Sequence, residues 1–407
     1  MNLLIIGYVW PETKSSAAGW HMLSLIRLFL EQSWSVTFAS PAQKTEHMDD
    51  LVSMGVAVEE IVLNCSSFDE FVGGLNPDIV VFDRFMMEEQ FGWRVAQKCP
   101  QALRILDTED LHSLRSARQN AVKKNKIIDD LFLEMATEDI TQREVAAIFR
   151  SDLTLMISDV EKQLLEERFS VSERQLHYLP FLLDKISPSQ KTFEERQHFV
   201  VIGNFRHQPN WDSVLWLKQL WPVIRKQLPD AELHIYGAYT PPKATALHNP
   251  KQGFLVKGWA DDVQAVMARA RVCLAPLRFG AGIKGKLVDA MRYGTPNITT
   301  SIGIEGIQGD CEWGGLVADN EVDIIDSAVQ LYTNKNLWQQ KQTTGFGLLS
   351  QRFDRETHAQ KLLERINSVK ATLDNHRKNN FIGSMLLHHH HKSTQYMSQW
   401  IETKNKL

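Results

Sequence analysis

Short apolar runs alternate with longer amphipathic stretches along most of this chain. Ten of the runs are predicted as strands: residues 3–6, 36–39, 79–82, 102–106, 153–157, 199–202, 232–236, 254–256, 272–275 and 297–300. Runs such as IVVF and VCLA show no alternation of apolar and polar positions, which is typical of strands buried on both faces of a parallel sheet. The repeated order of strand and helix therefore predicts an α/β fold.

The alternation is interrupted between residues 183 and 198, where the polar sequence LDKISPSQKTFEERQH predicts an interdomain linker. We therefore predict two Rossmann-like domains, residues 1–185 and 186–370, which face each other across a cleft. Ligands of open α/β sheets bind at the carboxyl ends of the strands, so this cleft is the expected site.

Residues 371–407 follow a different pattern and predict a helical tail. We expect this tail to cross back and pack on the first domain, because its apolar side chains need a surface to cover. These side chains are Phe381, Met385, Tyr396, Met397 and Trp400.

Composition narrows the classes of function. The net charge of −4 provides no global basic field that would collect nucleic acid. The four cysteines are scattered without a C-x-x-C pair, which argues against disulfides and zinc sites and fits a reducing compartment. The apolar run at residues 3–10 is too short to span a membrane, and no run of about 18 apolar residues occurs. We expect a cytoplasmic protein.

The strongest local signal lies in residues 272–307, where a buried strand leads through a glycine-rich loop into a short helix. Such a junction favours anion binding, because backbone N–H groups and the helix dipole point at the ligand and glycine permits close approach. Lys284 and Lys286 add two positive charges. A tight turn with solvated lysines is the alternative interpretation.

The same loop also matches a dinucleotide-binding pattern. Gly280, Gly282 and Gly285 spell G-x-G-x-x-G, and Glu305 follows at about the spacing of a ribose-binding acid. Three features weaken this interpretation: the motif follows a late strand, lysines interrupt the loop, and the helix has only about two turns. We expect that NAD(P) does not bind.

The loop and its helix resemble the donor site of family 4 glycosyltransferases, which have the GT-B fold. The sequence GAGIK is similar to the G-A-G-x-K loop of a subset of that family. Residues 151–165, 199–237 and 256–277 resemble further units of these enzymes. The resemblance implies a retaining transferase that moves a sugar from a nucleotide-diphosphate sugar to a glycan, lipid-linked or small-molecule acceptor.

The resemblance also implies roles for individual residues. Donor binding falls to Gly258, Gly280, Gly282, Ile283, Lys284, Lys286 and Asp289. Within this set, backbone amides of the loop bind the sugar and the diphosphate, the lysines neutralise the diphosphate, Asp289 holds the ribose hydroxyls and Gly258 lies by the base.

Two positions depart from the family's pattern. The first acid of its two-glutamate motif falls at Ala281, and its basic residue in the first loop of the donor domain falls at Asn204. We nominate Arg206, two residues later, to act with Lys284. Their fixed positive charges would stabilise the departing diphosphate.

The first domain contributes two loops to the expected cleft. Ser16 and Gly19 follow the first strand and are predicted to face the donor phosphates and the acceptor, unless the loop is a plain strand–helix turn. Asp110 and His112 follow the strand at residues 102–106, and the resemblance implies that one of them acts near the transferred sugar. Helix capping by Asp107 or Asp110, and a solvated His112, are the alternatives.

We expect no cofactor and no metal. The adjacent acids Asp261 and Asp262 are predicted to cap a helix, and the consecutive histidines at residues 388–391 lack the i, i+4 spacing of helical metal ligands. A basic stretch permits either a solvated helix face or attraction to an anionic membrane or a phosphate-bearing acceptor. Its members are Arg115, Arg118, Lys123, Lys124 and Lys126.

Three other functions stay open at this point. A nucleotide-sugar epimerase or a phosphorylase would use the same two-domain fold, although no cofactor lysine or phosphate site for a phosphorylase is recognisable. A non-catalytic nucleotide-sugar-binding protein would also fit, because Ala281 removes one acid.

Overall fold

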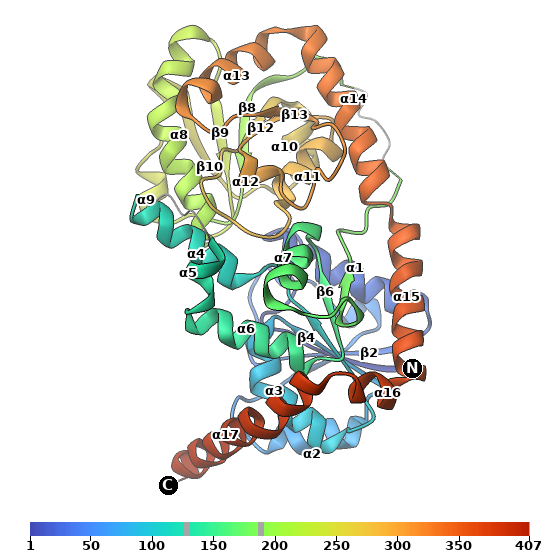
Figure 1. The fold of residues 1–407 in the computed structure, drawn as a ribbon. Helices are drawn as coiled ribbons and strands as arrows, with labels where there is room; N and C mark the ends of the chain where they lie inside the picture. The colour runs from blue at the N-terminus through green and yellow to red at the C-terminus, as the bar shows by residue number, and fades with distance from the viewer. Residues whose placement is uncertain (126–130, 186–190, 407) are drawn as a thin grey trace.

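The computed structural model describes residues 1–125, 131–185 and 191–406, without the side chains of residues 389–392. Figure 1 shows two α/β lobes stacked one above the other, with the last helix projecting from the lower lobe. The linker predicted at residues 183–198 lies between the lobes, although its residues 186–190 are outside the described part of the chain.

The first lobe is a seven-stranded parallel sheet in the order β3-β2-β1-β4-β5-β6-β7. Its strands are β1 (Asn2–Ile6), β2 (Ser35–Ser40), β3 (Ala57–Glu60), β4 (Ile79–Asp83), β5 (Leu103–Asp107), β6 (Leu153–Met156) and β7 (Leu176–Tyr178). Its helices are α1 (Ala17–Glu31), α2 (Ser67–Leu75), α3 (Phe85–Lys98), α4 (His112–Lys123), α5 (Leu131–Ala136), α6 (Asp139–Arg150) and α7 (Asp159–Phe169).

The second lobe is a six-stranded parallel sheet in the order β10-β9-β8-β11-β12-β13. Its strands are β8 (Gln197–Ile202), β9 (Leu233–Tyr236), β10 (Phe254–Gly258), β11 (Ala270–Leu274), β12 (Asn297–Thr299) and β13 (Gly315–Val317). Its helices are α8 (Gln208–Gln227), α9 (Pro242–Thr245), α10 (Val263–Arg269), α11 (Gly285–Arg292), α12 (Ser301–Ile304), α13 (Glu321–Thr333) and α14 (Lys335–Arg352).

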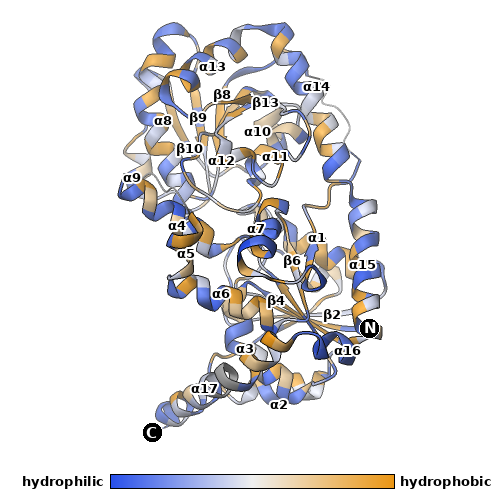
Figure 2. Ribbon diagram, viewed as in Figure 1, coloured by the Kyte–Doolittle hydropathy of each residue, from blue (hydrophilic) through white to orange (hydrophobic). Residues whose placement is uncertain are grey.

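The central strands are buried on both faces, as their apolar runs predict. Leu3 and Ile5 of β1 pack into one core of the first lobe, whereas Leu4 and Ile6 pack into the other. Figure 2 shows the apolar segments gathered along the strands and the inner faces of the helices. All ten predicted strands occur, and the three that were missed, β3, β7 and β13, lie at sheet edges.

The chain returns to the first lobe through α15 (Arg355–Ala371), which precedes α16 (Leu373–Lys378) and α17 (Phe381–Lys406). Leu362 and Ile366 of α15 are fully buried in the core that contains Leu3 and Ile5. The return therefore begins before residue 371. The outgoing and returning segments are joined by backbone bonds, since Leu183 N–H donates to Phe353 O over 2.9 Å and Arg355 N–H donates to Leu183 O over 3.0 Å.

The tail packs on the first domain, but with a different face from the predicted one. Helix α17 contacts α3 and α6, and its residues Gly383 and Ser398 are buried, Gly383 against Phe149 of α6 and Ser398 beside Asn64. The apolar side chains that were expected to cover the domain are exposed instead: Phe381, Met385, Tyr396, Met397 and Trp400. The prediction is wrong on this point because Gly383 allows the helix to approach the backbone of Phe149, and this close approach sets the contacting face.

Deleting residues 381–407 should therefore lower the stability of the protein only slightly. Few of the described side chains of the tail are buried, so we expect the melting temperature to fall by roughly 2–4 °C, the effect of about 1 kcal/mol in a domain of this size. Differential scanning calorimetry measures it, with Trp400→Ser as the exposed-residue control that leaves the temperature unchanged. A fall above about 10 °C would mean that the apolar face is covered in solution.

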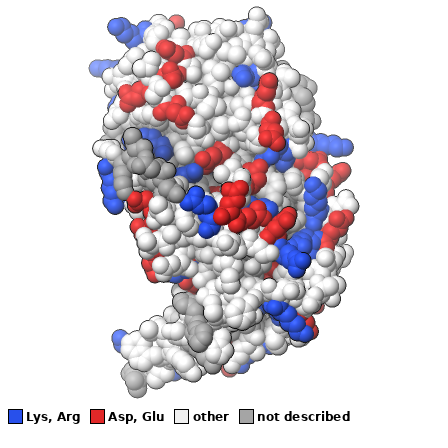
Figure 3. Space-filling model, viewed as in Figure 1, with Lys and Arg blue, Asp and Glu red and all other residues white. Residues whose placement is uncertain are grey.

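The surface carries charges of both signs. Figure 3 shows acidic and basic side chains interspersed over one face of both lobes. Within the described ranges, no helix combines the length and apolar character needed to cross a bilayer.

Candidate functional site

The glycine-rich loop connects β11 to α11 at the carboxyl end of the second sheet. Gly282 adopts a positive φ of 61°, a conformation that glycine tolerates best, and Ile283 is buried in the core of the second lobe. Lys284 is the N-cap residue of α11. The predicted strand, loop and helix are therefore present, and the start of α11 faces α1 of the first domain.

Both loop lysines are held in place by hydrogen bonds. Lys284 Nζ donates to Gly282 O over 2.9 Å, and Lys286 Nζ donates to Asn210 Oδ1 over 2.6 Å. Burial lowers the pKa of each ammonium to about 8, an effect that the Glu305 carboxylate opposes at Lys284. Asp289 follows on the same helix, and burial raises the pKa of its carboxyl to about 6.

The loop is closed against the first domain. Gly282 N–H donates to Glu161 Oε1 of α7 over 2.5 Å, and Arg118 of α4 donates to Gly280 O over 2.9 Å. Arg118 also forms a bidentate ion pair with Glu305, at 2.7 and 2.9 Å. Glu305, the acid that a dinucleotide site would use for ribose, is thus engaged in a contact between the domains.

Replacing Gly282 by alanine should weaken this closure. The new Cβ would lie 2.7 Å from Asp110 Cβ at a φ of +61°, so both the clash and the backbone conformation are unfavourable. We expect Gly282→Ala to lower the free energy of unfolding by about 1–2 kcal/mol and to open the cleft.

Chemical denaturation and small-angle X-ray scattering measure these two effects. Gly347→Ala is the matched control, because this glycine lies within α14 with nothing within 4 Å of an added Cβ. The control should be neutral or slightly stabilising. Equal behaviour of both variants would contradict the tight packing of Gly282 in solution.

The loop after β5 brings Asp110 and His112 to the same edge. His112 Nε2 lies 3.4 Å from Asp110 Oδ1, and Arg115 forms an ion pair with the other oxygen of Asp110. Although burial favours the neutral acid, Arg115 and then His112 hold the pKa of Asp110 well below its usual value. Burial lowers the pKa of His112 to about 4, so this imidazole is neutral at pH 7.

Neither Asp107 nor Asp110 caps the following helix. The N-cap residue of α4 is Leu111, without a side-chain cap, and the first free N–H groups of α4 are satisfied by Glu144 of α6. Its carboxylate accepts from His112 N at 2.9 Å and from Ser113 N at 3.0 Å. The capping alternative therefore does not account for the two aspartates.

The first-domain loop residues have clear local roles. Ser16 is the N-cap of α1, and its Oγ accepts from Gly19 N over 3.0 Å. A Cβ on Gly19 would lie 2.5 Å from Glu12 O, so the loop needs glycine there. The N-terminus of α1 meets that of α11, because a Cβ on Gly285 would lie 2.5 Å from Ala17 Cβ.

Arg206 and Gly258 lie on the second domain, and Arg206 contacts the first domain through Tyr239. The exposed Arg206 guanidinium stacks 3.6 Å from the centre of the Tyr239 ring, whose hydroxyl donates to Glu12 over 2.9 Å. Gly258 ends β10 with a φ of 76°, and its carbonyl accepts from Gly237 N. The structure thus places Arg206 on Tyr239 and not beside Lys284.

The groups that come from distant segments were not predicted from the sequence: Glu161, Glu144 and the Arg118–Glu305 pair. Arg118 appeared only as part of a basic stretch, whose Lys126 lies outside the described residues. One signal was available: Ser158 and Glu161 have the spacing of a capping box, and Ser158 Oγ does accept from Glu161 N over 3.3 Å. The predicted cap at Asp262 is confirmed, since it accepts from Ala265 N.

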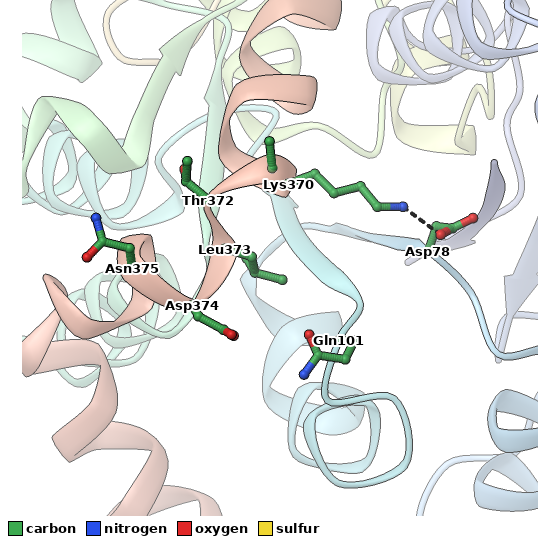
Figure 4. Close-up of a pocket in the computed structure, with 8 residues that line it drawn as sticks. Asp78, Gln101, Lys370, Thr372, Leu373, Asp374 and Asn375 are labelled. Atoms are coloured by element: carbon green, nitrogen blue, oxygen red, sulfur yellow. Dashed lines mark hydrogen bonds and ion pairs between the residues drawn. The ribbon is translucent and has the colours of Figure 1, made fainter.

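A separate hollow of about 570 Å³ lies at the opposite edge of the first sheet, lined by Asp78, Gln101 and residues 370–375. Figure 4 shows Lys370 reaching Asp78 across it, at 2.5 Å. Asp78 and Gln101 precede β4 and β5, so the hollow is at the amino ends of the strands, away from the usual ligand edge.

The second domain matches a known protein family. The sequence profile of the family Glycosyl transferases group 1 matches residues 196–334. The match supports a glycosyltransferase. The matched segment contains the glycine-rich loop, both lysines and Asp289.

A curated relative is the "Uncharacterized 44.6 kDa protein in cps region" of Klebsiella pneumoniae, 25% identical over 161 residues. The match covers 38% of this chain, and the chain spans only 42% of that relative's length.

Solved structures show the fold. The Anabaena protein HepE, in complex with UDP and glucose, is 12% identical, with a TM-score of 0.66 over 90% of this chain and 99% of HepE. WaaG, a glycosyltransferase involved in lipopolysaccharide biosynthesis, is 13% identical, with a TM-score of 0.60 over 88% of this chain and 98% of WaaG. The architecture is the GT-B fold.

Proposed function

We propose that the protein is a retaining glycosyltransferase that moves a hexose from a nucleotide-diphosphate sugar to a glycan, lipid-linked or small-molecule acceptor. The observation that carries this proposal is the loop from Gly280 to Lys286, which lies within the matched family segment and opens α11 beside two lysines. Helix starts of this kind bind phosphates.

The donor diphosphate would lie against the amides of Gly282 and Ile283, with Lys284 and Lys286 neutralising its charge. Asp289 would hold the ribose hydroxyls, and Gly258 would lie by the base. Because Gly282 N–H is bonded to Glu161 in this closed arrangement, donor binding requires that bond to be exchanged for one to phosphate.

Transfer would depend on stabilising the departing diphosphate. Lys284, whose Nζ bonds to Gly282 O, would fill this role, and Arg206 would join it by leaving Tyr239. Asp110 would be a weak base, because its lowered pKa gives it little affinity for a proton and Arg115 pairs with its carboxylate. Neutral His112 would hydrogen-bond the transferred sugar. We propose accordingly that fixed cations serve the leaving group without a metal or cofactor.

The wider setting of the proposal rests on the comparisons. HepE was crystallised with UDP and glucose, and WaaG is named for lipopolysaccharide biosynthesis, so a UDP-hexose and a glycan or lipid-linked acceptor are the first candidates. A nucleotide-sugar donor taken from the cytoplasm would agree with the reducing compartment that the scattered cysteines suggest. The basic stretch around Lys123 and Lys124 would then approach a membrane-bound acceptor.

The test starts with a panel of nucleotide sugars in a thermal-shift assay, since a ligand of the native state raises the midpoint. The donor that stabilises the protein is then incubated with candidate acceptors, nucleoside diphosphate release is measured, and the anomer of the product is read by NMR. Acceptor-dependent release with retained configuration supports the proposal. Stabilisation without release by any acceptor supports a binding protein, acceptor-independent conversion of the donor supports an epimerase, and an inverted product excludes retention.

A further inference from the structure

A buried polar cluster lies at the carboxyl edge of the first sheet, beside the loop that carries Asp110. His21 comes from α1, Asp107 ends β5, and Glu109 follows it. One nitrogen of His21 and one oxygen of each acid lie within 4.8 Å of one another, and His21 Nε2 is 3.8 Å from Asp107 Oδ2. His21 and Asp107 are fully buried, and Glu109 is 6% exposed.

The cluster lacks the hydrogen bonds that buried polar groups require. Within the described part of the chain, no partner is found for either ring nitrogen of His21, either carboxylate oxygen of Asp107, or Glu109 Oε1. Each orphaned group of this kind costs about 1–3 kcal/mol, and native proteins contain few of them. Something that satisfies all three residues at once would remove this cost.

The backbone also favours an assembled site. Glu109 adopts a positive φ of 60°, which is uncommon for a residue with a side chain and concentrates at functional sites. The cluster includes two carboxyl groups, and Asp83 is a third acid close by; the cation that acts on all three, Arg84, forms its ion pair with Asp83 at 3.8 Å. Two ionised carboxylates would therefore leave an excess of negative charge around a neutral imidazole.

We propose that His21, Asp107 and Glu109 bind one divalent transition-metal cation. One imidazole nitrogen and two carboxylate oxygens form a ligand set suited to Zn²⁺ or Mn²⁺, with bonds of about 2 Å. Ligand atoms in such a site lie roughly 3.3 Å apart, so modest side-chain rotations would close the present spacing. The site belongs to the first domain and does not replace the lysines as the cations for the leaving group.

Burial is the main influence on the protonation of the three side chains in the metal-free protein. Burial, and then the Asp83 carboxylate, raise the pKa of Asp107 to about 7; burial and then Asp107 raise that of Glu109. Burial lowers the pKa of His21 to about 4, which leaves the imidazole free to coordinate. A cation can bind only when the carboxyl protons leave, so we expect its binding to release protons. The positive charge of Arg84 opposes the cation.

A second group, His198, Glu232 and His234, has similar spacing on the surface of the second domain. It is a weaker candidate because its members already satisfy one another. Glu232 Oε2 lies 2.7 Å from His234 Nε2, and His198 Nδ1 accepts the Glu232 N–H over 3.2 Å. Because Nδ1 of neutral His198 accepts that bond, its proton is on Nε2, the nitrogen that faces the other two residues. A cation at Nε2 would move the proton to Nδ1 and so break the bond from Glu232 N–H.

The experiment titrates full-length, chelator-treated protein with Zn²⁺ by calorimetry and with Co²⁺ by visible absorption. We expect one equivalent to bind with proton release, shown by heats that differ between buffers of different ionisation enthalpy. His21→Gln should weaken binding at least tenfold and abolish the Co²⁺ band, whereas the control His234→Gln should retain both.

Circular dichroism shows whether metal-free His21→Gln is folded, and Asp107→Asn replaces it if it is not. Absence of binding by the parent protein overturns the proposal. The proposal is also overturned if His234→Gln abolishes binding while the folded first-domain variant retains it.

Discussion

Replacing Lys284 by methionine is expected to weaken nucleotide-sugar binding about ten- to a hundredfold. The ammonium lies at the start of α11, bonded to Gly282 O, where the proposed diphosphate would meet it. A hydrogen bond to a charged group contributes roughly 1.5–3 kcal/mol, which corresponds to this loss of affinity. Methionine keeps an unbranched apolar stem, so the variant removes the charge with little change in packing.

Calorimetric titration with the donor found in the panel measures the effect. Lys226→Met is the matched control, because Lys226 is an exposed lysine near the end of α8, at the far edge of the second domain. Its affinity should equal that of the parent protein. If Lys284→Met is folded and binds the donor as tightly as the control, the diphosphate does not lie in this loop.

The donor loop could be predicted because its chemistry is local. The glycines, the lysines and the helix that orients them occupy residues 280–292, so the groups of the proposed anion site are encoded in one short segment, even though Asn210 and Glu161 bond to it from elsewhere. The central strands were predictable for a similar reason, since each is a continuous apolar run. Edge strands such as β3 lack that run because one side faces solvent, and residues 57–60 include no fully buried position.

The closing contacts could not be predicted because they join distant segments. Glu161 and Gly282 are 121 residues apart, and Arg118 and Glu305 are 187 apart. Nothing in the sequence near α7 distinguishes Glu161 from an ordinary capping-box acid. The tail shows the same limit, because helical spacing identifies an apolar stripe on α17 but does not reveal which face the helix presents to α3 and α6.

The unusual environment of Glu161 leads to an expected pH dependence of stability. Burial, and then the nearby Asp110 carboxylate, raise the pKa of Glu161 to about 8, while the Gly282 N–H bond acts in the opposite direction. Between pH 4.5 and pH 8 the folded protein keeps a proton on Glu161 that the unfolded chain has released. The contribution of this residue to the free energy of unfolding therefore falls as the pH rises through that window.

Glu161→Gln cannot titrate, and its amide oxygen can still accept from one of the two N–H groups, Gly282 or Leu111, that bond to different oxygens of Glu161. The variant should gain stability relative to the parent protein as the pH rises, by at least about 1 kcal/mol between pH 5 and pH 8, since each pKa unit of the shift is worth 1.36 kcal/mol. Comparing two proteins that differ only at this position cancels the titration of unaffected groups. Lys284 couples to Glu161, so measurements stop at pH 8, near the pKa of that ammonium.

Urea denaturation at closely spaced pH values gives the difference directly. Glu167→Gln is the control, since Glu167 is an exposed carboxylate on the same helix, and its stability relative to the parent should stay constant from pH 5 to pH 8. A constant difference for Glu161→Gln as well would mean that Glu161 is ionised throughout this range. In that case its carboxylate would be stabilised by the Gly282 and Leu111 amides strongly enough to overcome burial, and donor phosphate would have to displace a full negative charge from the loop.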